Sequence, residues 1–181
     1  MLGPLLPIAT ISNGQIEPDD YIVFGGTFDP IHEGHLSIIR SALELFGSVI
    51  VAATTENPWK SDKPAPVALR KEMINLVLQA EQLPLAAAFG APGISIYPFD
   101  YQYSEEVVHE LRAHTDRGKL YWAVGEDTAA DVHRWRNWDQ LNVPVIVCPV
   151  IIELHATEIR SGTSEIHPAL VEFVRSHKLY V

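Results

Sequence analysis

Residues 25–36 read Gly-Gly-Thr-Phe-Asp-Pro-Ile-His-Glu-Gly-His-Leu. This stretch joins a short apolar run, 21–24, with the composition of a strand, to a segment with a helical pattern. Two glycines allow the backbone to turn sharply and approach a ligand, and the first N–H groups of the helix point back at the same place. His32 and His35 lie three positions apart, so both can face one bound anion. We therefore predict a phosphate-binding loop between a strand and a helix.

Strands and helices alternate outward from this loop. Apolar residues recur at helical spacing from Leu36 to Phe46, and Gly47 is a good helix stop. Further strands are predicted at 48–53, 94–97, 120–124 and 143–147. Helices are predicted at 67–82, 104–118 and 168–177, with shorter helical segments at 126–132, 135–141 and 157–161.

The predicted strands are continuously rich in Val and Ile, which is typical of a parallel sheet covered on both faces. The expected fold is α/β, a Rossmann-like doubly wound parallel sheet with helices on both faces, in a single domain at 21–181. Residues 1–20 are expected to form an N-terminal extension. Ligands bind such sheets beyond the carboxyl ends of the strands. The segments predicted to meet there are 25–36, 54–63, 125–127 and 157–160.

Composition excludes several classes of protein. A formal charge of −10 over 181 residues disfavours general nucleic-acid binding, which needs a cationic surface. The single cysteine, Cys148, rules out an intramolecular disulfide and a cysteine-rich metal site. The apolar start lacks a basic region and contains Pro4 and Pro7, so we expect no signal peptide, and no apolar run reaches transmembrane length. The expected location is the cytoplasm.

The glycine-rich stretch differs from the better-known nucleotide and metal motifs. It lacks both the Walker A pattern and the Gly-x-Gly-x-x-Gly fingerprint. The pair His32 and His35 is also not a zinc pair, because that chemistry needs His-Glu-x-x-His, with the histidines four positions apart. Gly34 costs about 1 kcal/mol relative to alanine inside a helix, which favours close passage of a ligand such as a nucleobase or sugar. No protein-held metal is predicted.

Residues 25–36 resemble the signature of the HIGH-motif nucleotidyltransferases, and most closely that of the bacterial nicotinate mononucleotide adenylyltransferases. The similarity continues along the chain. The matching segments are Asn57-Pro58-Trp59-Lys60, Arg70 with Met73, Tyr103-Ser104, Gly125-Glu126-Asp127, Trp135, Ala156-Thr157-Glu158-Ile159-Arg160 and Leu179-Tyr180.

The resemblance implies roles for individual residues. The catalytic set is His32, His35, Lys60 and Arg160. The nucleotide-binding set is Gly25, Gly26, Thr27, Phe28, Gly34, Gly125, Asp127, Thr157 and Ile159, with Ile159 against adenine and Gly125 and Asp127 near the ribose. The acceptor-binding set is Ser104 and Trp135, with Trp135 stacked on a pyridine ring.

Residue chemistry supports some of these roles independently. Arg160 carries the planar charged fork that suits phosphate. Thr157 is a good candidate N-cap for a helix whose first N–H groups would also face an anion. A tryptophan face is a suitable platform for an electron-poor ring, although Trp135 and Trp138, three apart on a predicted helix, are also explained by core packing.

The implied reaction transfers AMP from ATP to nicotinate mononucleotide and releases pyrophosphate, with Mg²⁺ held mainly by the phosphates of ATP. The expected partners are these two substrates, without nucleic acid or membrane, and a homo-oligomer is compatible with the sequence. Trp59, Ser104 and His155 differ from the residues usual in the family, and they leave the acceptor open. Two alternatives therefore stand: a related transferase with another phosphate-bearing acceptor, and a catalytically weakened nucleotide-binding sensor.

Overall fold

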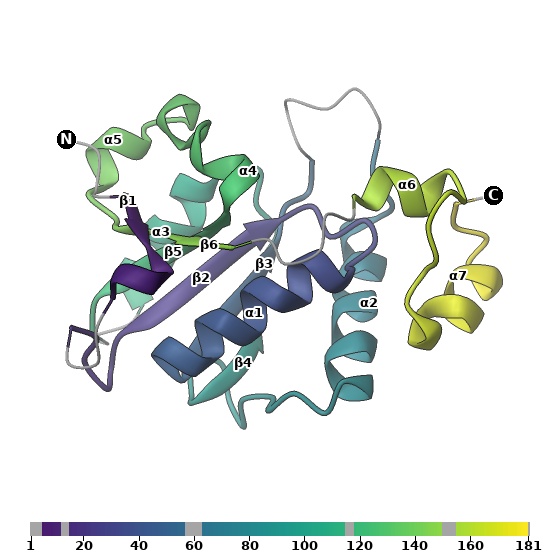
Figure 1. Ribbon diagram of the computed structural model, residues 1–181, viewed down its shortest axis with the longest axis horizontal. Coiled ribbons are helices and arrows are strands. Elements are labelled where there is room, and N and C mark those ends of the chain that lie inside the picture. Colours follow the sequence, from purple (N-terminus) through teal and green to yellow (C-terminus); the bar gives the residue numbers. More distant parts are fainter. Residues whose placement is uncertain (1–4, 12–14, 57–62, 115–117, 150–154, 181) are drawn as a thin grey trace.

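The computed structural model describes residues 5–11, 15–56, 63–114, 118–149 and 155–180. A parallel six-stranded sheet in the order β1-β6-β5-β2-β3-β4 runs through this part of the chain (Figure 1). Its strands are β1 (Leu5–Pro7), β2 (Tyr21–Gly26), β3 (Ser48–Ala53), β4 (Gly93–Ile96), β5 (Leu120–Gly125) and β6 (Val145–Cys148). The α-helices are α1 (Glu33–Phe46), α2 (Val67–Ala80), α3 (Ser104–His114), α4 (Glu126–Ala129), α5 (Trp138–Leu141), α6 (Ala156–Arg160) and α7 (Val171–Ser176). The short 3₁₀ helices in the described residues are η1 (Ile8–Thr10), η2 (Val132–Arg134) and η3 (Pro168–Leu170).

The predicted α/β fold is confirmed. Helix α1 ends at Gly47, whose φ of 64° is the left-handed conformation that glycine adopts without penalty. Strand β5 is buried at every position and β2 from Tyr21 to Phe24, as expected for a sheet covered on both faces. No helix in the described ranges is both long and apolar enough to cross a membrane.

Strand β1 was not expected from the sequence. Its three residues lie in the predicted N-terminal extension and pair in parallel with β6 at the edge of the sheet. The burial pattern of β1 is exposed, intermediate, exposed, so its side chains carry no continuous apolar signal. The pairing of its backbone with β6 therefore places it in the sheet.

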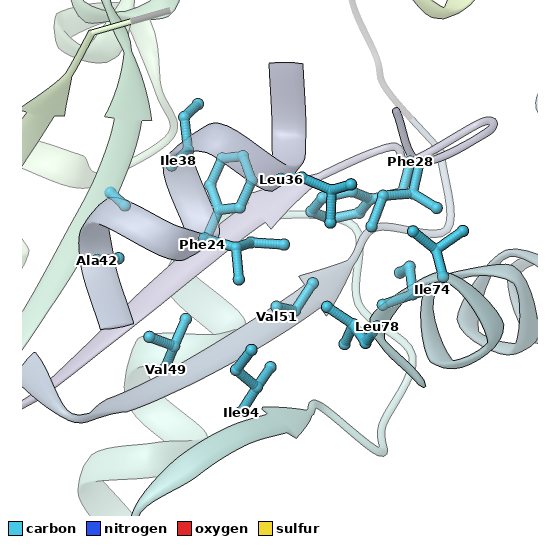
Figure 2. Close-up of a cluster of buried hydrophobic side chains, with 14 of the residues drawn as sticks. Phe24, Phe28, Leu36, Ile38, Ala42, Val49, Val51, Ile74, Leu78 and Ile94 are labelled. Atoms are coloured by element: carbon cyan, nitrogen blue, oxygen red, sulfur yellow. The ribbon is translucent and has the colours of Figure 1, made fainter. Parts of the chain in front are cut away.

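Alternate residues of the central strands supply two cores, one on each face of the sheet. On one face, Phe24 and Val51 pack beneath α1 and α2, against Leu36 and Ile74 (Figure 2). On the other face, Val23 lies in a second cluster with buried residues of α3 and α5. Packing from both sides holds β2 rigidly.

The chain order reverses at β2, and this reversal indicates where a ligand would bind. The chain runs outward from β2 through β3 to β4, and then crosses back to β5 on the other side of β2. In open parallel sheets the crevice beyond the carboxyl ends of two such strands is the usual ligand site. Gly26 ends β2 and Gly125 ends β5, so the predicted loops meet at this crevice.

Candidate nucleotide-binding site

The two glycines of the phosphate loop serve packing rather than turning. Gly25 and Gly26 both lie in β2, and the left-handed residue of the loop is Phe28, with φ 50°. A Cβ atom on Gly25 would lie 2.5 Å from Cζ2 of Trp122, and one on Gly26 would lie 3.1 Å from the Phe28 ring. The expectation that the glycines make the sharp turn was therefore wrong. A Cβ at Gly25 would overlap the buried Trp122 ring, and a Cβ at Gly26 would be in tight contact with the Phe28 ring.

The two histidines lie together at the start of α1. His32 is the N-cap, and its backbone N–H donates to Nδ1 of His35 at 3.2 Å. The ring centroids of the two imidazoles are 3.7 Å apart, and His35 also packs against Phe28 at 4.8 Å. Because Nδ1 of His35 accepts a hydrogen bond, we assign its proton to Nε2. His35 then carries its N–H at Nε2.

Arg70 holds the segments that surround the phosphate loop. Its side chain is fully buried on α2 and donates to the carbonyl groups of Thr27, Thr54, Thr55 and Ala65. Burial lowers the pKa of this guanidinium, although it still carries its charge at neutral pH. The loop after β2, the end of β3 and the approach to α2 are therefore tied to one cation.

Arg160 reaches the same loop from α6. Its Nη1 donates to the backbone carbonyl of Asp29 at 2.8 Å, and its Nη2 lies 3.5 Å from Oγ1 of Thr157. The expectation that Thr157 caps this helix was wrong: the N-cap is His155, whose backbone N–H donates to Glu158 at 2.9 Å. Thr157 lies within the first turn, so its hydroxyl is directed by the helix toward Arg160.

Three tryptophans that follow or lie in β5 and α5 form a cluster. Trp122, Trp135 and Trp138 contact one another edge to face, with ring centroids 5.1–6.0 Å apart. Trp138 is fully buried in α5, whereas Trp135 precedes that helix, is half-buried and lines the cavity. The two therefore do not share a helix as predicted. Packing explains Trp138, and Trp135 presents part of its ring to the site.

These groups surround one cavity of about 1470 Å³. Most of the residues predicted to form the site line it: Gly25, Gly26, Thr27, Phe28, His32, Gly34, His35, Ser104, Gly125, Asp127, Trp135, Thr157 and Arg160. Ile159 is buried in α6 and is not among the lining residues. Lys60 lies outside the described residues. The structure thus brings together segments from the two halves of the chain.

Ionisable side chains of both signs line the cavity. At the phosphate-loop end these are His32, His35, His155, Arg160 and the carboxylate Asp29. After β5 the carboxylates Glu126, Asp127 and Asp131 line it together with Arg134 and Arg136. Carboxylates are suitable acceptors for sugar hydroxyl groups, and guanidinium groups are suitable donors to phosphate.

Comparison with known proteins identifies the family. The model of the cytidylyltransferase-like family matches residues 23–166, which is well over half of the chain. This chain belongs to the cytidylyltransferase-like family. The resemblance of its phosphate loop to nucleotidyltransferases is confirmed at this level.

Two curated relatives of this cytidylyltransferase-like chain share a name. A protein of Ruegeria pomeroyi named "probable nicotinate-nucleotide adenylyltransferase" is 32% identical over 127 residues, which cover 68% of this chain and 56% of that protein. A Neisseria meningitidis protein of the same name is 29% identical over 195 residues, covering 87% of this chain and 96% of the other. The match thus spans about half the length of the first relative and nearly all of the second.

Two solved structures share the fold. A Vibrio parahaemolyticus protein described as a candidate nicotinate-nucleotide adenylyltransferase superposes with a TM-score of 0.69 at 16% identity, covering 90% of this chain and 95% of that one. The Plasmodium falciparum nicotinic acid mononucleotide adenylyltransferase in complex with NaAD gives a TM-score of 0.67 at 14% identity, covering 90% and 97%. At these identities the likeness establishes the fold of the cytidylyltransferase-like chain.

Sequence reasoning assigned no role to Asp29 and only a family match to Arg70. Both had a local signal. Arg70 shares the buried face of α2 with Met73 and Ile74, and a charged residue on an apolar helix face indicates a buried polar network. Asp29 lies between the left-handed Phe28 and a proline, where a carboxylate readily receives backbone N–H groups. Their partners come from distant segments, so the sequence alone does not identify them.

Proposed function

We propose that the chain transfers AMP from ATP to nicotinate mononucleotide and releases pyrophosphate. The observation that carries this proposal is that the phosphate loop, His35 and Arg160 line the same cavity as Trp135 and Ser104. The phosphate-loop end of the cavity has hydrogen-bond donors for a triphosphate, and the end at Trp135 has an aromatic face on which the ring of an acceptor can stack. The shared name of the two curated relatives supports the same substrates.

The chemistry we propose is direct in-line displacement. An oxygen of the acceptor phosphate forms a bond to the α-phosphorus of ATP, and the bond from that phosphorus to the bridging oxygen breaks as pyrophosphate leaves. The reaction needs no protein nucleophile, so the chain contributes by positioning the two substrates and stabilising the charge of the transferring group.

His35 is suited to this task by its hydrogen bond to the backbone. Its Nδ1 accepts from the His32 N–H, so the Nε2–H is held in one direction while the ring is braced by Phe28. We propose that this N–H donates to an oxygen of the triphosphate. Arg160 would hold the outer phosphates, and Asp127 would accept from the ribose.

Magnesium enters this proposal as part of the MgATP substrate. Among the described residues there is no group of three or more His, Cys, Asp or Glu side chains that could hold a metal ion. Mg²⁺ keeps several waters and commonly binds through substrate phosphates, which fits a site without a carboxylate cage. The ion would neutralise charge on the departing pyrophosphate.

The acceptor end offers a cation beside the aromatic face. Nε of Arg136 pairs with Oε1 of Glu105 at 2.8 Å, and its guanidinium lies 4.7 Å from the centroid of the Tyr103 ring. Both contacts fix the direction of the side chain, which lines the cavity next to Trp135. We propose that Arg136 attracts the negative groups of a mononucleotide acceptor.

A panel assay of pyrophosphate release tests the proposal. ATP and CTP are each combined with nicotinate mononucleotide, nicotinamide mononucleotide, phosphopantetheine and glycerol phosphate. We expect the highest kcat/KM for ATP with nicotinate mononucleotide. A higher kcat/KM for another acceptor would refute the acceptor assignment alone. The absence of turnover with every pair would refute the proposed enzymatic activity and favour a nucleotide-binding sensor.

A tryptophan variant tests the acceptor end separately. Replacing Trp135 with alanine should raise the KM of the acceptor about tenfold, because stacking on an aromatic face contributes about 1–3 kcal/mol. The KM of ATP should stay unchanged. Phe99→Ala is the matched control, since Phe99 is exposed and is not a cavity residue. An equal change in both KM values would contradict the assignment.

A further inference from the structure

Glu105 is a buried carboxylate beside the acceptor end of the cavity. Only 8% of the residue is exposed, although it lies in the first turn of α3, where an acidic side chain usually faces water. Glu105 is not among the residues that line the cavity, whereas Tyr103 and Ser104, directly before it, are. A buried carboxylate is normally paired with a cation, so the partner of Glu105 indicates its task.

The partner of Glu105 is Arg136, which does line the cavity. Nε of Arg136 forms an ion pair with Oε1 of Glu105 at 2.8 Å, and the guanidinium lies over the Tyr103 ring, 4.7 Å from its centroid. The carboxylate thus contacts the guanidinium at its inner nitrogen, and the aromatic ring contacts it from one face. Together they fix the direction of a group that carries further N–H donors on its terminal nitrogens.

This ion pair connects two helices that the core already holds together. Leu111 of α3 and Trp138 of α5 lie in the same buried cluster, and Arg136 comes two residues before Trp138. Nη1 of Arg112 also donates to the carbonyl of Leu141 at 2.8 Å, which joins α3 to the end of α5. The two sides of the ion pair are therefore placed by packing, and the pair itself only has to orient one guanidinium.

The proposed acceptor carries two negative groups at opposite ends, a carboxylate on its ring and a phosphate on its ribose. The phosphate has to reach the α-phosphorus of ATP, which the proposed reaction places at the phosphate loop. The ring is placed at Trp135, and Arg136 is the next residue along the chain and lines the same cavity. A guanidinium beside the ring is suited to the ring carboxylate, and a neutral amide in that place has no charge to pair with it.

We propose that Glu105 is a positioning residue which, through Arg136, makes the site select an acceptor with a ring carboxylate over the corresponding amide. By holding Nε, it keeps the terminal N–H groups of Arg136 directed at the ring substituent. An arginine without this support would lose more side-chain entropy on binding and would favour the carboxylate less. The inference rests on the acceptor site of the proposed function and names what selects the acceptor there.

Glu105→Ala removes the carboxylate and tests this role. Calorimetry measures the Kd of nicotinate mononucleotide and of nicotinamide mononucleotide. Mg²⁺ and an ATP analogue with a methylene group between the α- and β-phosphorus are present, because the analogue prevents turnover. We expect the Kd of the acid to rise about three- to tenfold, as for one weakened charge-assisted hydrogen bond, and that of the amide to stay within about twofold. An equal rise of both Kd values would indicate a structural role or a phosphate contact and would overturn the proposal.

A conservative variant and a matched control separate orientation from charge and from folding. Glu105→Gln should retain the preference for the acid, because its amide oxygen can still accept a hydrogen bond from Nε of Arg136. A loss of preference as large as that of Glu105→Ala would overturn the proposal. Glu110→Ala is the control, since Glu110 lies on the same helix, pairs with His114 at 3.3 Å and is not a cavity residue. It should leave both Kd values unchanged.

A double-mutant cycle shows whether Glu105 acts through Arg136. In an Arg136→Met background, Glu105→Ala should change the Kd of the acid by less than about twofold, because the group that it orients is gone. The same three- to tenfold loss in that background would overturn the proposal, even if Glu105→Ala also lowers the Tm.

Failure of this inference is distinguishable from failure of the proposed function. If the unaltered chain releases pyrophosphate with nicotinate mononucleotide and Glu105→Ala keeps the full preference for the acid, only the role of Glu105 is refuted. If the unaltered chain binds the acid more tightly than the amide, loses this preference in Glu105→Ala and turns over no acceptor, the proposed transfer is refuted and the role of Glu105 in binding is supported. Equal binding of acid and amide by the unaltered chain, or binding of neither, refutes both the inference and the proposed acceptor.

Discussion

Replacing Arg70 with methionine should destabilise the whole site as well as the fold. Methionine is unbranched and apolar, so it fills much of the same space but donates no hydrogen bonds. Arg70 donates to Ala65 O at 2.6 Å, to Thr54 O at 2.7 Å, to Thr55 O at 2.9 Å and to Thr27 O. The substitution leaves all of these carbonyl groups without their donor.

The expected loss follows from those contacts. A buried acceptor without a partner costs about 1–3 kcal/mol, but water can reach the carbonyl groups nearest the cavity. Removing the buried charge also removes the unfavourable free energy of its desolvation, which is the cause of the lowered pKa of Arg70, and this offsets part of the loss. We expect the free energy of unfolding to fall by about 3–5 kcal/mol, as for one partner removed from a buried charged network. For a chain of this size the Tm falls by about 6–20 °C.

Urea unfolding followed by tryptophan fluorescence measures this loss. Arg175→Met is the matched control: the Arg175 side chain is 77% exposed and pairs with Glu172, and an exposed ion pair contributes about 0–1 kcal/mol. A loss for Arg70→Met as small as that of the control would refute the view that this cation holds the loops together.

Three further outcomes are expected. His35→Ala should lower kcat about 10²–10³-fold, as for an oxyanion donor, while circular dichroism shows an unchanged fold; an unaltered kcat would remove His35 from the mechanism. Gly25→Ala should cost about 1–3 kcal/mol of stability by overpacking against Trp122, so a Tm equal to that of the unaltered chain would contradict the packing argument. The hydrogen bond from His167 lowers the pKa of Glu81 from 4.5, so the stabilisation of the fold by this carboxylate is complete above about pH 4.5 and is lost as pH falls through the lower folded-state pKa. Glu81→Gln should therefore flatten the fall of Tm at acid pH. A Tm that falls with pH in parallel for both proteins would count against this pair.

Local pattern was enough to predict most elements. The segment 48–53 is apolar at every position after Ser48 and forms β3 with the same bounds, and the expected helix at 67–82 is α2, Val67–Ala80. Their periodicities differ clearly because a strand buried on both faces is apolar at every position, whereas a helix is apolar on one stripe. Leu5–Pro7 has neither pattern, since 51% of Leu5 is exposed, and only pairing with β6 makes it a strand.

The candidate site was predictable only in part. The loop chemistry of residues 25–36 is local, and His32 and His35 lie together as their spacing predicts. The cap of α6 was misassigned because His155 and Thr157 are both capable acceptors, and the choice depends on where the chain enters the helix. The role of Lys60 stays a prediction.

Local patterns in the sequence were sufficient to predict the α/β class, the phosphate loop and its histidines, because these depend on spacing within about a dozen residues. Only the tertiary structure decided why Gly25 must be glycine, which tryptophan faces the cavity, and how Asp29 joins Arg160 to Tyr180. Those relations connect positions as far as 151 residues apart. Packing across the sheet brings them together, and no local pattern of residues records such a contact.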